Sequence, residues 1–192
     1  MTTTPGGPGR YTLPHTEMTV PLPVRVVDYQ ELETHDGVAH TCRLIVDGVD
    51  VGKMENTGHG GPTTLYPHSS EHRPAWKALI DGARNRHGDP MDEEDLADEL
   101  THEAYMEAEV CKVQRSRTKY AVRITSLENL LDDGDADEIR DVLPFKFAKA
   151  VDVTDENVTK YFGQATRRQL PERLVRADVW LKDHWKQFFP TT

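Results

Sequence analysis

The residues with the clearest capacity for chemistry form the segment Thr57-Gly58-His59-Gly60-Gly61-Pro62. Three glycines around one histidine allow the backbone to turn sharply, to present consecutive N–H groups and to approach a ligand closely. No Gly-Lys-Ser or Gly-Lys-Thr follows, as a P-loop requires, and the glycine spacing differs from the dinucleotide-binding fingerprint. The segment therefore has two interpretations: an anion-binding loop built from Gly58, His59, Gly60 and Gly61, or an ordinary tight connection.

A run of basic residues is the second group suited to an anion. Five Lys and Arg and no carboxylate occur from Lys112 to Arg123. Arg115, Arg117 and Lys119 have the charge to bind phosphate oxygens, and Tyr120 offers a ring for stacking. The alternative is that these cations complement a helix C-terminus and pair with nearby acids.

Together the two groups give our first functional hypothesis. It is a small, soluble, non-enzymatic binding protein that holds an anionic ligand, for example a nucleotide, between the glycine-rich segment and the basic run. The sequence names no cofactor.

Histidines suggest a different chemistry. His59, His68 and His72 lie close together in the sequence, and the last two are four residues apart, as in zinc sites on a helix. This spacing gives a metal-dependent hydrolase as an alternative function. Pro67 and Ser69-Ser70 place His68 before the helix, however, which favours solvent-facing histidines. No catalytic triad and no nucleophile motif can be assigned.

Acidic residues dominate another stretch. Ten carboxylates and no Lys or Arg occur from Asp89 to Glu109, in a chain with a net charge of −10. This balance argues against a surface that binds nucleic acid throughout. The stretch is typical of a solvated helix face, and it also gives a second hypothesis: an acidic interaction or inhibitor protein that binds a basic partner, such as a nucleic-acid-processing enzyme.

The elements that would position these residues begin with a hairpin. Asp47-Gly48, between stretches 40–46 and 49–55, is typical of a type I′ turn. It pairs Val46 with Val49 and Leu44 with Val51, with Cys42 further along the same core-facing side. Helices are predicted at 71–86, at 92–115 and from Pro171 onward. The fold class is α+β: a small antiparallel β-sheet (hairpin 40–55 plus strands near 24–29 and 119–125) with helices packed on one side.

The expected organisation has four parts. They are a flexible tail at 1–22, an α+β core at 23–126, an acidic loop at 127–145 and a helical segment at 146–192 on the same core. Trp185, Phe188 and Phe189 would mediate a homodimer or a protein contact if exposed. Cys42 and Cys111 are expected to be reduced and buried. The sequence has neither a membrane-length apolar run nor a signal peptide pattern, so we expect no membrane contact and a cytoplasmic location.

Overall fold

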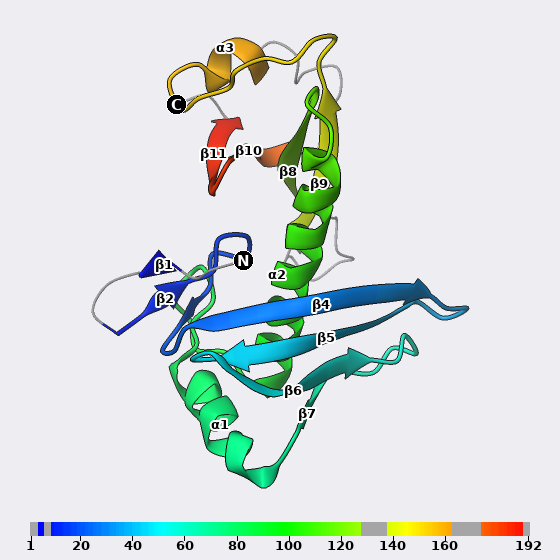
Figure 1. Ribbon diagram of the computed structural model, residues 1–192, viewed down its shortest axis with the longest axis vertical. Helices are drawn as coiled ribbons and strands as arrows, with labels where there is room; N and C mark the ends of the chain where they lie inside the picture. The colour runs from blue at the N-terminus through cyan, green and yellow to red at the C-terminus, as the bar shows by residue number, and fades with distance from the viewer. Residues whose placement is uncertain (1–3, 6–8, 128–137, 163–173, 190–192) are drawn as a thin grey trace. The chain divides into compact units, whose positions relative to one another are not determined.

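The computed structural model describes residues 4–5, 9–127, 138–162 and 174–189 (Figure 1). It confirms the α+β class, with antiparallel sheets and a few helices. The chain divides into two compact units, residues 1–108 and 109–192, which we take in turn. The strand expected near 119–125 lies in the second unit and belongs to a separate sheet from the hairpin.

The first unit is built on a four-stranded sheet in the order β4-β5-β6-β7. The strands are β4 (Val24–Glu33), β5 (Val38–Val46), β6 (Val49–Asn56) and β7 (Thr64–Pro67). A short 3-10 helix, η1 (Ser70–His72), leads into α1 (Arg73–Gly82), and α2 (Glu93–Gln114) follows. Apolar side chains from one face of the sheet and from both α-helices form a single core: Val24, Val26, Cys42, Leu44, Val46, Val51, Met54, Leu65, Trp76, Leu79, Leu96 and Leu100.

The hairpin has the predicted turn but a different register. Asp47 and Gly48 both have positive φ, at 49° and 81°, as a type I′ turn needs. Val46 pairs with Val49, but an irregularity between Leu44 and Ile45 then pairs Leu44 with Gly52 rather than with Val51. The bulge keeps Leu44 and Val51 buried, whereas Val49 is 52% exposed. The alternation in the sequence carries no signal for such an extra residue.

The predicted flexible tail at 1–22 is wrong for the residues that the structure describes. Strands β1 (Thr4–Pro5), β2 (Tyr11–Thr12) and β3 (Thr19–Val20) form a small sheet. Leu13, Met18 and Val20 are buried in the core of the first unit. The turn between β2 and β3 is held by Glu103 of α2, whose carboxylate accepts the backbone N–H groups of His15 and Thr16. Core burial, backbone hydrogen bonds between Thr19 and Arg84, and the distant Glu103 carboxylate together hold a Pro-rich and Thr-rich stretch that lacks periodicity of its own.

The second unit contains a four-stranded sheet in the order β11-β10-β8-β9. Its strands are β8 (Lys119–Leu127), β9 (Glu138–Lys146), β10 (Leu174–Leu181) and β11 (His184–Phe189). The short helix α3 (Val158–Phe162) contributes Val158 and Phe162 to a core that also holds Val122, Phe145, Val179 and Phe188. Aromatic rings dominate this core, and Phe162 contacts the rings of Tyr120, Phe145, Phe147 and Phe188.

Two predictions for this part of the chain are wrong. Strand β9 covers the end of the expected acidic loop at 127–145, of which residues 128–137 lie outside the described residues. Where a helix from Pro171 was expected, the described residues 174–189 form the β10–β11 hairpin. Ala177, Val179 and Leu181 alternate as a strand requires, but Asp178 and Trp180 between them are buried too. An ion pair of Asp178 with Arg123 permits this double-sided burial, and it hides the period of two.

Candidate functional site

Hydrogen bonds hold the glycine-rich segment in place. The Gly58 N–H donates to Asn56 Oδ1 at 2.8 Å, and the Gly58 carbonyl accepts from Thr34 Oγ1 at 3.0 Å. Asn56 Nδ2 also donates to the Gly61 carbonyl at 2.8 Å. Gly58 has φ +74, and a Cβ there would lie 2.6 Å from the backbone N of Ala39. Gly58 is therefore required by its backbone conformation and by the β4–β5 turn against which it packs.

His59 is 65% exposed at the outer side of this segment. Its Nε2 lies 4.0 Å from the Asp36 carboxylate, so an anion approaching the imidazole would also meet a negative charge. One of the backbone donors expected to bind the anion, the Gly58 N–H, is already used internally. Gly60 and Gly61 have open space around them.

The basic run is divided by the structure. Arg115, Arg117 and Lys119 are exposed, around the short turn between α2 and β8. In the described part of the chain, none of these three forms an ion pair. Lys112, by contrast, pairs with Glu109. Arg123 is 2% exposed, bonds to Asp178 at 3.0 Å and lies 4.9 Å from the centre of the Trp185 ring.

The two halves of the predicted anion site fall in different units. Gly58, His59, Gly60 and Gly61 belong to the first unit, while Arg115, Arg117 and Lys119 belong to the second. The combined site therefore remains a prediction.

The three histidines of the predicted metal site have different neighbours in the structure. The rings of His68 and His72 are 6.3 Å apart, edge to face, and His68 Nε2 lies 3.0 Å from Asp50 Oδ1. His59 is instead beside Asp36. Among the residues that the structure describes, no three His, Cys, Asp or Glu side chains are grouped so that they could hold a metal ion. The metal-dependent hydrolase alternative stays a prediction.

The C-terminal aromatic residues and the two cysteines differ in how far they are exposed. Phe188 is 2% exposed in the core of the second unit, and Phe189 packs against that core. Trp185 contacts Trp180, with ring centres 5.1 Å apart. Phe188 therefore does not meet the condition of exposure, whereas Trp185 and Phe189 are half-buried, and a partner or homodimer contact through them stays a prediction. Cys42 is buried as predicted, but Cys111 is exposed.

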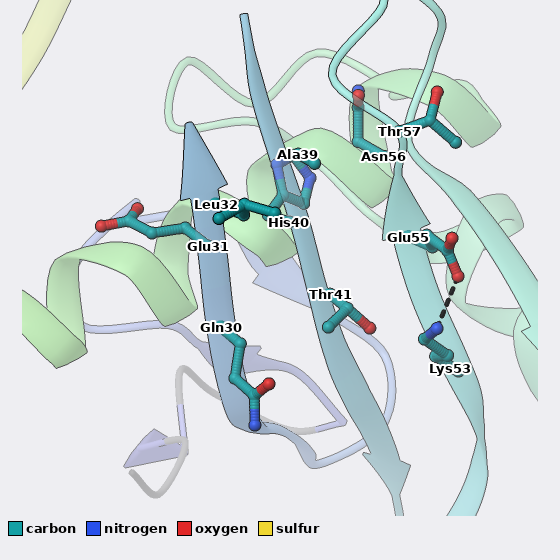
Figure 2. Close-up of a pocket in the computed structure, with 10 residues that line it drawn as sticks. All are labelled: Gln30, Glu31, Leu32, Ala39, His40, Thr41, Lys53, Glu55, Asn56 and Thr57. Atoms are coloured by element: carbon teal, nitrogen blue, oxygen red, sulfur yellow. Dashed lines mark hydrogen bonds and ion pairs between the residues drawn. The ribbon is translucent and has the colours of Figure 1, made fainter. Parts of the chain in front are cut away.

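A hollow that the sequence did not suggest lies at the end of β4, β5 and β6 next to the β4–β5 turn (Figure 2). Its volume is about 360 Å³, and we call it the distal groove. Its lining is mostly polar: Gln30, Glu31, Leu32, Ala39, His40, Thr41, Lys53, Glu55, Asn56 and Thr57. Figure 2 shows Gln30, Thr41, Lys53 and Glu55 projecting from three neighbouring strands. Lys53 pairs with Glu55 at 2.6 Å, so the one cation of the lining is neutralised within the groove.

Carboxylates and aromatic rings surround this end of the sheet. Glu31 accepts a hydrogen bond from the Tyr29 hydroxyl at 3.0 Å. The Tyr29 ring stacks near His40, and it meets Tyr105 of α2 edge to face. Burial lowers the pKa of His40, against the opposing effect of the Asp98 and Glu31 carboxylates. His40 is therefore biased toward its neutral form, which leaves the carboxylates as the charges that a ligand would meet.

The comparisons give no relative from which a role could be transferred. No known protein family, curated protein or solved structure matches this chain. In the described residues, no helix combines the length and the apolar character needed to cross a membrane.

The sequence signal that could have located the groove is the alternation Gln30-Glu31-Leu32-Glu33, which extends the first strand beyond its predicted end at residue 29.

Proposed function

We propose that this chain is a binding protein whose first unit docks a cationic segment of a partner protein at the distal groove. The observation that carries this proposal is the groove itself: a hollow on an exposed sheet end with two carboxylates, Glu31 and Glu55. Its one lysine, Lys53, pairs with Glu55, so the lining keeps a net negative charge. Polar groups that converge on a hollow can orient a ligand and give the site specificity.

The charge of the first unit supports the same conclusion. Residues 1–108 contain 19 Asp and Glu against 8 Lys and Arg, whereas residues 109–192 contain 14 against 15. The negative charge of the chain is thus concentrated in the unit that holds the groove. Glu33, Asp36 and Asp98 are exposed and add to the acidic field around it. Such a field accelerates and orients the approach of a basic partner.

The test uses a labelled, end-blocked peptide of alternating lysine and serine, with a glutamate–serine peptide of equal length as control. Fluorescence anisotropy should show binding of the cationic peptide alone, with an affinity that falls as salt is added. The double variant E31K/E33K should weaken binding about ten-fold or more, because two attractive charges become repulsive. The matched variant E71K/D81K reverses two exposed charges on η1 and α1. Equal losses in both variants, or none in either, would reject the groove as the site.

A second candidate is favoured by the exposed cations in the second unit. Arg115, Arg117 and Lys119 have no described ion-pair partner, which suits a phosphate-bearing ligand. A thermal-shift measurement with tripolyphosphate is the direct probe, because a ligand that binds only the folded state raises Tm. The increase should disappear in R115E/R117E and persist in E31K/E33K. A shift that survives R115E/R117E would place the anion elsewhere.

A further inference from the structure

Strand β4 presents an unusual edge next to the distal groove. It forms the end of its sheet, so its described pairing is with β5 on one side only. From Gln30 onward, after a register shift between Val27 and Gln30, the pairing of β4 with β5 is regular: Gln30 pairs with Thr41, Glu31 with His40, Leu32 with Ala39, and Glu33 with Val38. All four residues of the stretch 30–33 are exposed, and Leu32 is 70% exposed. An edge of this kind carries backbone N–H and C=O groups that point away from the sheet.

A bulge limits the usable edge to this short stretch. The register between β4 and β5 shifts between Val27 and Gln30, and Asp28 adopts φ 56. The Asp28 carboxylate bonds to Arg43 of β5, which holds the bulged residue in place. Because a bulge bends and twists its strand and interrupts the ladder locally, a short added strand in one regular register is confined to one side of it. The stretch 30–33 is therefore the part of the edge that a further strand could join.

The charges on this stretch select the kind of strand. Glu31 and Glu33 lie on the same side of β4, two residues apart, and Leu32 between them lines the groove. A second copy of this chain pairing edge to edge would bring carboxylates close to carboxylates, which is unfavourable. Acidic residues on an edge protect a protein against such self-association. In a cationic strand that alternates basic and apolar residues, the basic side chains would meet Glu31 and Glu33, and the apolar side chain between them would meet the exposed Leu32.

We propose that an extended cationic segment of another protein adds to the outer edge of β4 at Gln30–Glu33, as a fifth strand of the sheet. This inference rests on the proposed function and states how the partner is held. The backbone of the segment pairs with β4, its basic side chains lie against Glu31 and Glu33, and an apolar side chain covers Leu32. Backbone pairing gives affinity that depends little on sequence, and the alternate side chains give selectivity.

The experiment compares two end-blocked nonapeptides of alternating lysine and valine that carry the same charge. One has ordinary backbone amides, and in the other every amide is methylated and cannot donate a hydrogen bond. With the full chain, the unmethylated peptide should bind about ten-fold or more tightly than the methylated one. Binding should also slow hydrogen exchange of backbone amides within 30–33, and E31K/E33K should abolish both effects while E71K/D81K retains them.

The outcomes separate this inference from the function on which it rests. Equal, salt-sensitive binding of both peptides, lost in E31K/E33K, would overturn strand addition while the cationic groove survived. Failure of both peptides to bind at low salt would overturn the proposed function itself. A dimer of the chain seen by analytical ultracentrifugation, with protection of 30–33 in the absence of peptide, would identify a second copy as the occupant and overturn the inference.

Discussion

Glu103 is the side chain whose loss should disturb the first unit most. It is fully buried on α2, and its Oε2 accepts the backbone N–H of Thr16 at 2.6 Å and that of His15 at 3.0 Å. Glu103→Ala leaves two buried donors without an acceptor, each costing about 1–3 kcal/mol. The expected loss in the free energy of unfolding is therefore about 2–5 kcal/mol, reduced where water enters the space. Glu103→Gln should cost less, about 1–2 kcal/mol, because one amide oxygen at the Oε2 position can accept both bonds.

The stability that Glu103 contributes should also depend on pH. Burial raises the pKa of Glu103, against the effects of His15 and of the backbone hydrogen bonds. The folded state therefore holds the proton more tightly than the unfolded state. The stability gained from this group is present at low pH and declines as the pH rises from the usual range of a glutamate carboxyl through the raised pKa of the folded state. The stability of the Glu103→Gln variant lacks this decline. The difference in free energy of unfolding between the variant and the wild type should therefore become smaller over that pH range.

Urea unfolding at several pH values, together with hydrogen exchange of the His15 and Thr16 amides, measures these effects. The exchange data report the turn between β2 and β3 directly, because the two units need not unfold together. Glu94→Gln, at an exposed position on α2, is the matched control and should change stability by less than about 0.5 kcal/mol. A Glu103→Ala loss no larger than that of Glu94→Gln, or a deficit of Glu103→Gln that widens with pH, would refute the argument.

Three further predictions follow from local geometry. Gly58→Ala should destabilise the first unit by about 2–4 kcal/mol in urea unfolding, against about 1 kcal/mol for Gly60→Ala. Both glycines have positive φ, but only Gly58 meets backbone atoms, and equal losses would contradict the packing. Burial raises the pKa of the Cys42 thiol to about 11, whereas Cys111 is exposed. Iodoacetamide should therefore modify Cys111 in the native protein and Cys42 only after unfolding, which peptide mass mapping would show. Hydrogen bonds to Asp183, and to a lesser extent to Asp155, raise the pKa of His184. The protonated imidazole should therefore contribute about a few tenths of a kcal/mol of stability below about pH 6.5, and this contribution should be lost as the pH rises through the pKa of the folded state. NMR titration of Asp155→Asn should show a lower His184 pKa, and an unchanged value would remove Asp155 as a cause.

Elements whose signal is local were predictable, and those that depend on distant partners were not. The Asp47-Gly48 turn and the apolar period of α2 need only neighbouring residues, and both are present. The turn within residues 11–20 bonds to Glu103, and the buried Asp178 of β10 pairs with Arg123. Both partners lie far away in the sequence, so neither pattern is visible in its own segment. The distal groove was missed for a related reason, because it exists only where three strands lie side by side.

The glycine-rich segment shows why one sequence pattern can have two causes. Gly58 is required by its positive φ and by the backbone of Ala39, and Gly60 has a positive φ. Gly61 has neither demand: nothing lies within 4 Å of a Cβ placed there, and its φ lies outside the left-handed region. Gly61→Ala should therefore leave the free energy of unfolding unchanged within about 0.5 kcal/mol.

Gly61 can consequently test ligand binding without disturbing the fold. If the predicted anion site uses this backbone, an added methyl group should obstruct the close approach of a phosphate, and Gly61→Ala should reduce the Tm increase produced by tripolyphosphate. An increase that is lost in R115E/R117E but retained in Gly61→Ala would confine the anion to the second unit. The segment from Gly58 to Gly61 would then serve only to connect β6 to β7.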